Sequence, residues 1–70
     1  MNWEELKEEA KKMGYSLDID YTKNEFLHKL IDKKHFCFRE DGAIDDGIYY
    51  GIIAENRTPD QMLAIMKALQ

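Results

Sequence analysis

The sequence predicts a small α+β fold in a single domain, residues 1–70, with N- and C-terminal helices packed on one face of an antiparallel sheet of three to four strands. Two observations lead to this prediction. Apolar residues recur at helical spacing near both ends of the chain, between residues suited to cap helices. The middle of the chain alternates apolar and polar residues and contains the turn dipeptides Asp41-Gly42 and Asp46-Gly47. The expected element order is α-β-β-β-(β)-α.

The first helix is expected over residues 2–13. Asn2 is suited to cap its first turn, and Glu5 follows three residues later, which is the spacing of a capping box. Gly14 can adopt the left-handed conformation that often ends a helix. An apolar stripe on this helix would face the sheet: Trp3, Leu6, Ala10 and Met13.

Two strands are expected next. Residues 15–21 alternate apolar and polar side chains, which predicts a half-buried strand with an acidic outer face. Residues 25–31 fit either a short helix with a capping box at Thr22 and Glu25 or a strand that returns after a turn at Lys23-Asn24. We favour the strand, because a meander joins neighbouring elements through short loops.

A third strand is expected at residues 35–40, after a polar turn. The alternation places Phe36 and Phe38 on one face of this strand and Cys37 and Arg39 on the other.

The last third of the chain predicts strands and one helix. Residues 43–44 form at most a very short strand, and residues 48–54 read as a central strand in which Gly51 marks a bulge or a close approach. Thr58 and Pro59 are typical of the first positions of a helix. The apolar face of this helix would contain Met62, Leu63, Ile65, Met66 and Leu69.

Charge and composition narrow the function classes. The net charge is −4, and residues 35–58 carry five acidic and two basic side chains, which disfavours direct binding to nucleic acid or to anionic lipid. No apolar run approaches the ~20 residues that a membrane span needs. The first residues do not show the basic segment followed by an apolar segment that is typical of a signal peptide, and the chain has one cysteine. We therefore expect a cytoplasmic protein without an internal disulfide.

Side chains with catalytic or metal-binding chemistry are few. Cys37 could pair with His35 or His28 as nucleophile and base, but residues two apart on a strand lie roughly 6–7 Å from each other, beyond hydrogen-bond reach. The same three residues would offer zinc three ligands without a fourth. The carboxylates after Asp41 miss the register of a calcium loop. We therefore expect a structural thiol, no metal, no cofactor and no enzymatic activity.

The candidate partner-binding residues lie in and after the acidic turn region, residues 40–47. Two adjacent tyrosines on one strand must point to opposite faces, so one of them would face away from the helices and could contact a partner. The alternative interpretation is that the carboxylates only form turns and keep the chain soluble. The candidates are Glu40, Asp41, Asp45, Asp46, Tyr49 and Tyr50.

The C-terminal half also carries a resemblance. A strand runs into an acidic glycine turn at residues 38–42, and residues 53–62 lead into a terminal helix that ends at 67–69. With these features, residues 36–69 resemble small uncharacterised proteins carried by phages and prophages of Gram-positive bacteria. The resemblance implies an accessory protein of a mobile element that acts by binding a host or phage protein, and it assigns no catalytic residue.

Two function hypotheses follow. The first is a small non-enzymatic protein-interaction module with a protein partner, and it leaves open a homodimer through an exposed sheet face. The second is an acidic inhibitor that mimics nucleic acid and so blocks a nucleic-acid-binding protein. In that case Asp18 and Asp20 would join the acidic turn residues in replacing phosphates.

Overall fold

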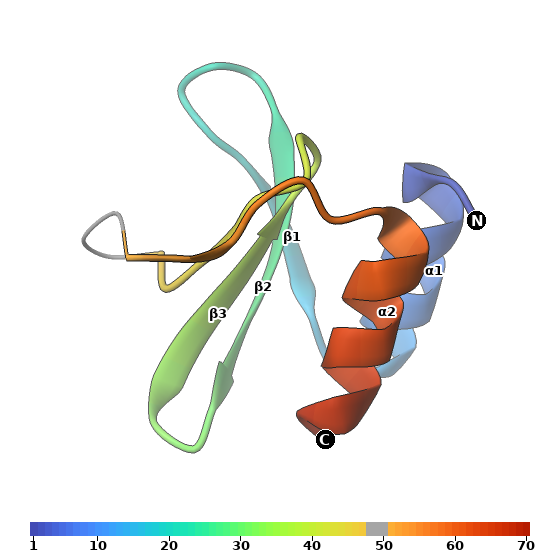
Figure 1. Cartoon of the computed structure of the whole chain (residues 1–70), viewed down its shortest axis with the longest axis vertical. Coiled ribbons are helices and arrows are strands. Elements are labelled where there is room, and N and C mark those ends of the chain that lie inside the picture. The colour runs from blue at the N-terminus through green and yellow to red at the C-terminus, as the bar shows by residue number, and fades with distance from the viewer. Residues whose placement is uncertain (48–50) are drawn as a thin grey trace.

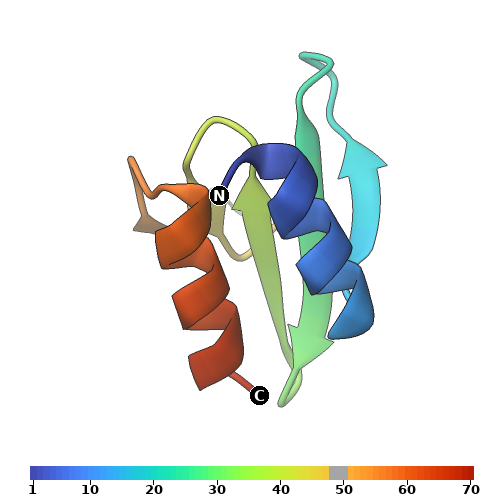
Figure 2. The same cartoon turned by 90° about the vertical axis from the view of Figure 1, so that its right-hand side faces the viewer.

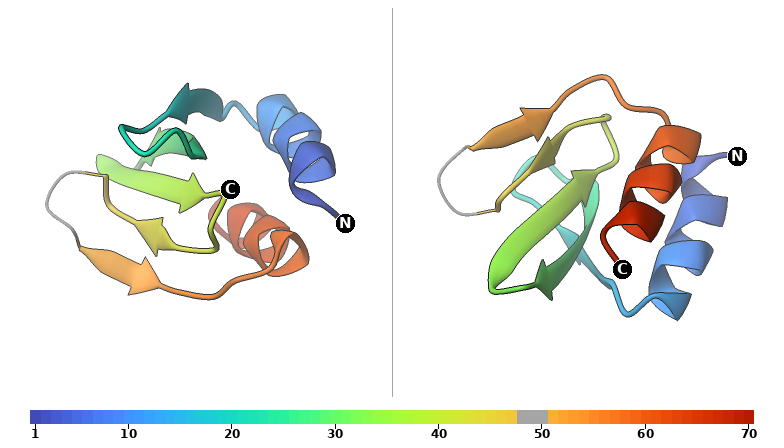
Figure 3. Two further views of the ribbon diagram at one scale, coloured as in Figure 1. Left: turned by 90° about the horizontal axis from the view of Figure 1, so that it is seen from above. Right: turned by 60° about the horizontal axis from the view of Figure 1, so that its bottom comes forward.

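The computed structural model describes residues 1–47 and 51–70 of the chain. Within these residues, five strands form one antiparallel sheet in the order β1-β2-β3-β4-β5, and both helices lie on the same side of it (Figures 1 and 3). The predicted α+β class is confirmed, with a sheet one strand larger than the upper expectation. The elements are α1 (Trp3–Lys12), β1 (Ser16–Ile19), β2 (Glu25–Ile31), β3 (Lys34–Arg39), β4 (Ile44–Asp45), β5 (Ile52–Ala54) and α2 (Pro59–Ala68).

Both helices begin and end as their caps predict. Asn2 and Glu5 form a reciprocal capping box at the start of α1, and Thr58 and Gln61 form another at the start of α2. Gly14, with φ of +91°, follows α1 in the left-handed region. In the described part of the chain, neither helix has the length and apolar character needed to cross a membrane.

The core lies between the helices and the sheet face turned towards them. Phe38 is fully buried there, and its ring packs edge-on against the Tyr15 ring with centroids 5.6 Å apart. Trp3 is half-buried against the same core, and its indole N–H donates to Glu25 Oε1 at 3.0 Å. The fully assembled core consists of Leu6, Ala10, Tyr15, Leu27, Phe38, Ile44, Met62 and Met66.

The first two hairpins have tight polar turns. Residues 25–31 form a strand, as favoured from the sequence, and the preceding turn is held by Asp20 Oδ1, which accepts the amides of Thr22 and Asn24. Between β2 and β3, Asp32 and Lys33 both have positive φ, 49° and 67°, as in a two-residue type I′ turn. The turn leads directly into β3, which lies within one residue of the strand expected at 35–40.

The predicted half-burial of residues 15–21 is wrong except at Tyr15. Leu17 is 47% exposed, Ile19 63% and Tyr21 95%. The reason is position in the sheet: β1 is an edge strand, and Figure 2 shows it as the outermost strand beyond the part of the sheet that the helices cover. Alternating apolar residues on an edge strand can remain exposed when no helix packs over that strand.

The prediction of a central strand at residues 48–54 is also wrong. The described part of this segment is β5, a three-residue strand at the other edge of the sheet, where Ile52 and Ile53 are more than half exposed. Ile52 pairs with Asp45 and Ala54 with Ile44, so Ile53 is an extra residue that forms a bulge. Tyr49 and Tyr50 lie outside the described residues.

Candidate functional site

The sheet face turned away from the helices carries most of the polar side chains of the strands. Alternation along β2 and β3 directs Phe26 and His28 from one strand, and Cys37 and Arg39 from the next, onto this outer face. Asp45 of β4 joins them because it pairs with Cys37. The sequence predicted that Cys37 and Arg39 share a face, and the register confirms this; that this face is the outer one is seen only in the structure.

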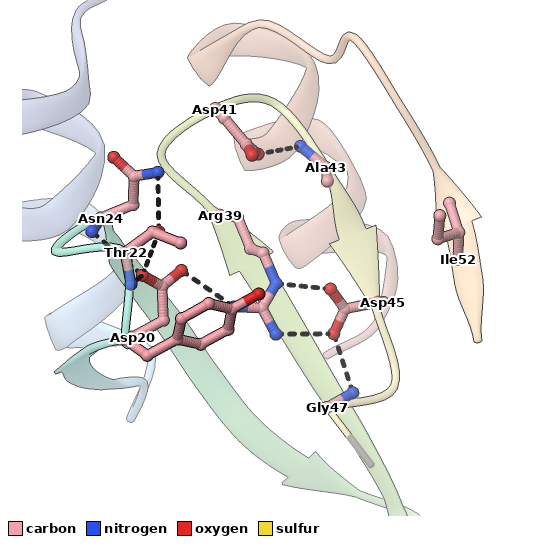
Figure 4. Close-up of a pocket in the computed structure, with 10 residues that line it drawn as sticks. Asp20, Thr22, Asn24, Arg39, Asp41, Ala43, Asp45, Gly47 and Ile52 are labelled. Carbon is pink, nitrogen blue, oxygen red and sulfur yellow. Dashed lines mark hydrogen bonds and ion pairs between the residues drawn. The ribbon is translucent and has the colours of Figure 1, made fainter. Parts of the chain in front are cut away.

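Arg39 forms the centre of an ion cluster on the outer face (Figure 4). Its Nε and Nη2 donate to the two carboxylate oxygens of Asp45 at 2.5 and 3.2 Å, and its Nη1 lies 3.5 Å from Asp20 Oδ2. The guanidinium also lies 4.9 Å from the centroid of the Phe26 ring. The hydrogen bonds that Arg39 donates to Asp45 raise the pKa of Arg39 above its usual value. The cation is therefore already neutralised by groups of the same chain.

An open pocket of about 470 Å³ surrounds this cluster. The turn after β1 forms one wall and the turn on either side of β4 forms the other, as Figure 4 shows. Because Asp20 and Asp45 flank Arg39, the pocket offers an anion no free guanidinium. Hydrogen bonds from Thr22 and Asn24 hold the pKa of Asp20 below its usual value, so this carboxyl is ionised at neutral pH and is not suited to act as a general acid.

A second polar group lies further along the same face. His28 Nε2 is 2.8 Å from Asp18 Oδ2, and His28 Nδ1 is 3.1 Å from His35 Nε2. Within the two described segments, no three His, Cys, Asp or Glu side chains come together as metal ligands.

The thiol of Cys37, considered from the sequence as a possible nucleophile, is buried beneath the turn at Gly47. Cys37 is 1% exposed, and burial raises the pKa of its thiol to about 11. The turn at Gly47 packs against it so closely that a Cβ on Gly47 would lie 2.6 Å from Cys37 Sγ and 2.8 Å from His35 Nδ1. The thiol is therefore protonated at neutral pH and out of contact with solvent, as expected of a structural cysteine.

The structure separates the acidic residues that the sequence grouped. Glu40 and Asp41 are exposed, and each accepts a backbone amide, Glu40 from Glu25 and Asp41 from Ala43. Asp46 is half-buried. Asp45 is 8% exposed and also accepts the Gly47 amide, so while paired with Arg39 it is not available to a partner.

An apolar surface that the sequence assigned to the core lies along β1. We call Leu17 and Ile19 the apolar margin; both point to the helix side of the sheet but beyond the helices. A shallow groove of about 440 Å³ runs between α1 and this margin. It is lined by Glu4, Lys7, Glu8, Lys11, Tyr15, Ser16, Leu17 and Leu27. The sequence pattern placed Leu17 and Ile19 on one face of a strand, but it did not indicate that this strand lies at the edge of the sheet.

Comparison with other proteins does not assign a function to this surface. The chain matches no protein-family model, no curated protein and no solved structure.

Proposed function

We propose that this chain is a small non-enzymatic protein-interaction module that binds its partner through the apolar margin and the adjoining part of β1. The observation that supports the proposal most is the exposure of Leu17 and Ile19, 47% and 63%, in a protein with a small core. Side by side on one strand, they offer a continuous apolar strip with a groove next to it. Tyr21, 95% exposed in the following turn, lines the pocket on the outer face instead and is not part of this strip.

The chemistry of the other side chains supports a binding role over catalysis. The Cys37 thiol has its pKa raised to about 11, and Arg39 is neutralised by Asp45 and Asp20. Those same pairs make the second hypothesis, a nucleic-acid mimic, less favourable. A mimic needs free carboxylates in a row, whereas Asp20 and Asp45 are already bound to Arg39. The resemblance to phage and prophage proteins adds that the partner is a host or phage protein.

Affinity capture from a lysate of the encoding cells tests this function. The bait is the wild-type chain, a Leu17→Thr/Ile19→Thr double variant, or an Ile52→Thr variant as the matched control at the opposite edge. Threonine retains strand propensity while removing most of the apolar surface. We expect the wild type and Ile52→Thr to retain the same protein and the double variant to lose at least about 90% of it, equivalent to a tenfold or greater loss of affinity. Equal capture by all three baits, or no retained protein, would contradict the proposal.

A further inference from the structure

The edge of β1 presents backbone hydrogen-bonding groups together with the apolar margin. Asp20 N–H donates to Asn24 O at 2.9 Å, so the backbone of Asp20 faces β2. Backbone groups of successive residues in an antiparallel strand point in opposite directions. Leu17 and Ile19 therefore direct their N–H and C=O groups to the open edge.

The pairing on the far side of β2 agrees with this assignment. Ile19 lies opposite Glu25, and the Glu25 carbonyl accepts the Glu40 amide from the β3 side at 3.0 Å. Glu25 thus turns its backbone away from β1, which leaves the backbone of Ile19 without an internal strand partner. Among the described strands β1 has β2 as its single neighbour, so the backbone groups of Leu17 and Ile19, which point away from β2, meet no described strand.

The two edges of the sheet differ in how they are protected. β5 carries the bulge at Ile53, which hinders the addition of another strand. β1 pairs with β2 without a register shift from Ser16 to Ile19, and it contains no lysine or proline. The β1 edge is therefore regular and open to an added strand.

A strand added at the β1 edge would need different side chains on its two faces. On the helix side, a neighbouring strand would meet the apolar margin. On the outer side it would meet Asp18, whose side chain is 62% exposed although it also contacts His28. An added strand with apolar residues opposite Leu17 and Ile19 and a basic residue opposite Asp18 would match both faces.

We propose that β1 is extended by an antiparallel strand from a partner protein, an extended segment in which apolar residues alternate with lysine or arginine. This inference rests on the proposed function and specifies how its surface is used. A second copy of the chain is a poorer occupant, because antiparallel pairing centred on Asp18 would place two Asp18 carboxylates directly opposite each other. The net charge of −4 likewise favours a basic partner.

A capped heptapeptide of alternating valine and lysine is the direct probe. Its valines should lie opposite Leu17 and Ile19 and form the hydrogen-bonded pairs, so amide exchange at these two residues should slow about tenfold or more at saturating peptide. The same peptide with methylated valine nitrogens cannot donate to β1 and should give no protection. Binding of the methylated peptide with equal protection would overturn strand addition.

A charge exchange tests the selection for basic residues. Asp18→Lys should weaken binding of the valine–lysine peptide at least fivefold and strengthen binding of a valine–glutamate peptide. An unchanged preference would overturn the choice of a basic partner. Sedimentation of the protein alone tests whether a second copy of the chain occupies the β1 edge. A dimer in which the Leu17 and Ile19 amides are protected from exchange would overturn the proposal of a partner strand in favour of a second copy.

The outcomes separate this inference from the proposed function. If the peptide leaves Leu17 and Ile19 unprotected while affinity capture still depends on them, strand addition is wrong and the interaction function stands. If the peptide protects both amides in wild type but the lysate yields no partner, the edge accepts a strand as proposed, and the general function fails in those cells.

Discussion

Replacement of Asp45 by alanine distinguishes a structural carboxylate from a partner-binding one. In the folded chain this side chain accepts two hydrogen bonds from Arg39 and one from the Gly47 amide, and it is 8% exposed. Hydrogen bonds to charged groups each contribute about 1.5–3 kcal/mol. Because Arg39 is about a quarter exposed and retains Asp20, we expect Asp45→Ala to lower the unfolding free energy by about 2–3 kcal/mol in total.

Urea unfolding at pH 7, followed by circular dichroism, measures this loss. A 70-residue domain has a total stability of roughly 4–10 kcal/mol, so the expected change is a large fraction of it. Asp41→Ala is the matched control, since this carboxylate is exposed and accepts one local amide, and its loss should be below about 1 kcal/mol. If Asp45→Ala costs no more than Asp41→Ala, the ion pair does not stabilise the sheet. A double-mutant cycle with Arg39→Met should then show no coupling, whereas we expect about 1–2 kcal/mol.

Three further predictions concern the core and the turn at Gly47. Gly47→Ala should lower the unfolding free energy by about 2 kcal/mol or more, because φ is +75° and the added Cβ would overlap neighbouring side chains. Gly14→Ala should lose about 1 kcal/mol, because its φ is also positive but the added Cβ would lie at an ordinary contact distance of 3.5 Å from the Lys29 side chain. Cys37 should be alkylated about a hundredfold more slowly in the folded than in the unfolded chain at pH 8, since its pKa is raised from 9.0 to about 11. Because the thiol has a higher pKa in the folded than in the unfolded chain, its contribution to the unfolding free energy should be complete below about pH 9 and should fall as the pH rises towards 11. Urea unfolding curves measured across that pH range would detect the change. Met66→Ala should cost about 2–5 kcal/mol at a fully buried position, whereas Leu30→Ala, 67% exposed, should stay within about 0.5 kcal/mol, and a comparable loss at both would contradict the assigned core.

The helices and hairpins could be predicted because their signals are local. Asn2 and Thr58 cap their helices through residues three positions away, and the turn at Asp32 and Lys33 closes a two-residue loop. Such patterns involve neighbours in sequence and leave little choice of structure. Gly51 was a further local signal: a Cβ there would lie 2.5 Å from Asp46 Oδ2, which agrees with the predicted close approach.

The candidate site was less predictable because it depends on how the strands pair, which adjacent residues do not specify. Asp45 lies in an acidic, glycine-bearing stretch that reads as a solvated turn, yet it pairs with Arg39 six residues earlier and is buried. That outcome follows from the register of β3 on β4, which the turn residues alone do not specify. Glu40 and Asp41, by contrast, stay exposed, and each accepts one backbone amide.

The open edge of β1 follows from the small size of the helical layer. Two ten-residue helices cover the sheet around Phe38, at its third strand, and exclude water from the middle of it. A third helix would be needed to cover Leu17 and Ile19, and the described residues contain none. The exposure of the apolar side chains on β1 is therefore a consequence of the architecture. The same two residues also carry backbone groups that point away from β2. A strand added at this edge would cover both the side chains and the backbone groups in one step, whereas a helix docked on the margin would leave the amides of Leu17 and Ile19 unpaired. This difference is the physical reason for favouring an extended partner segment over a helical one.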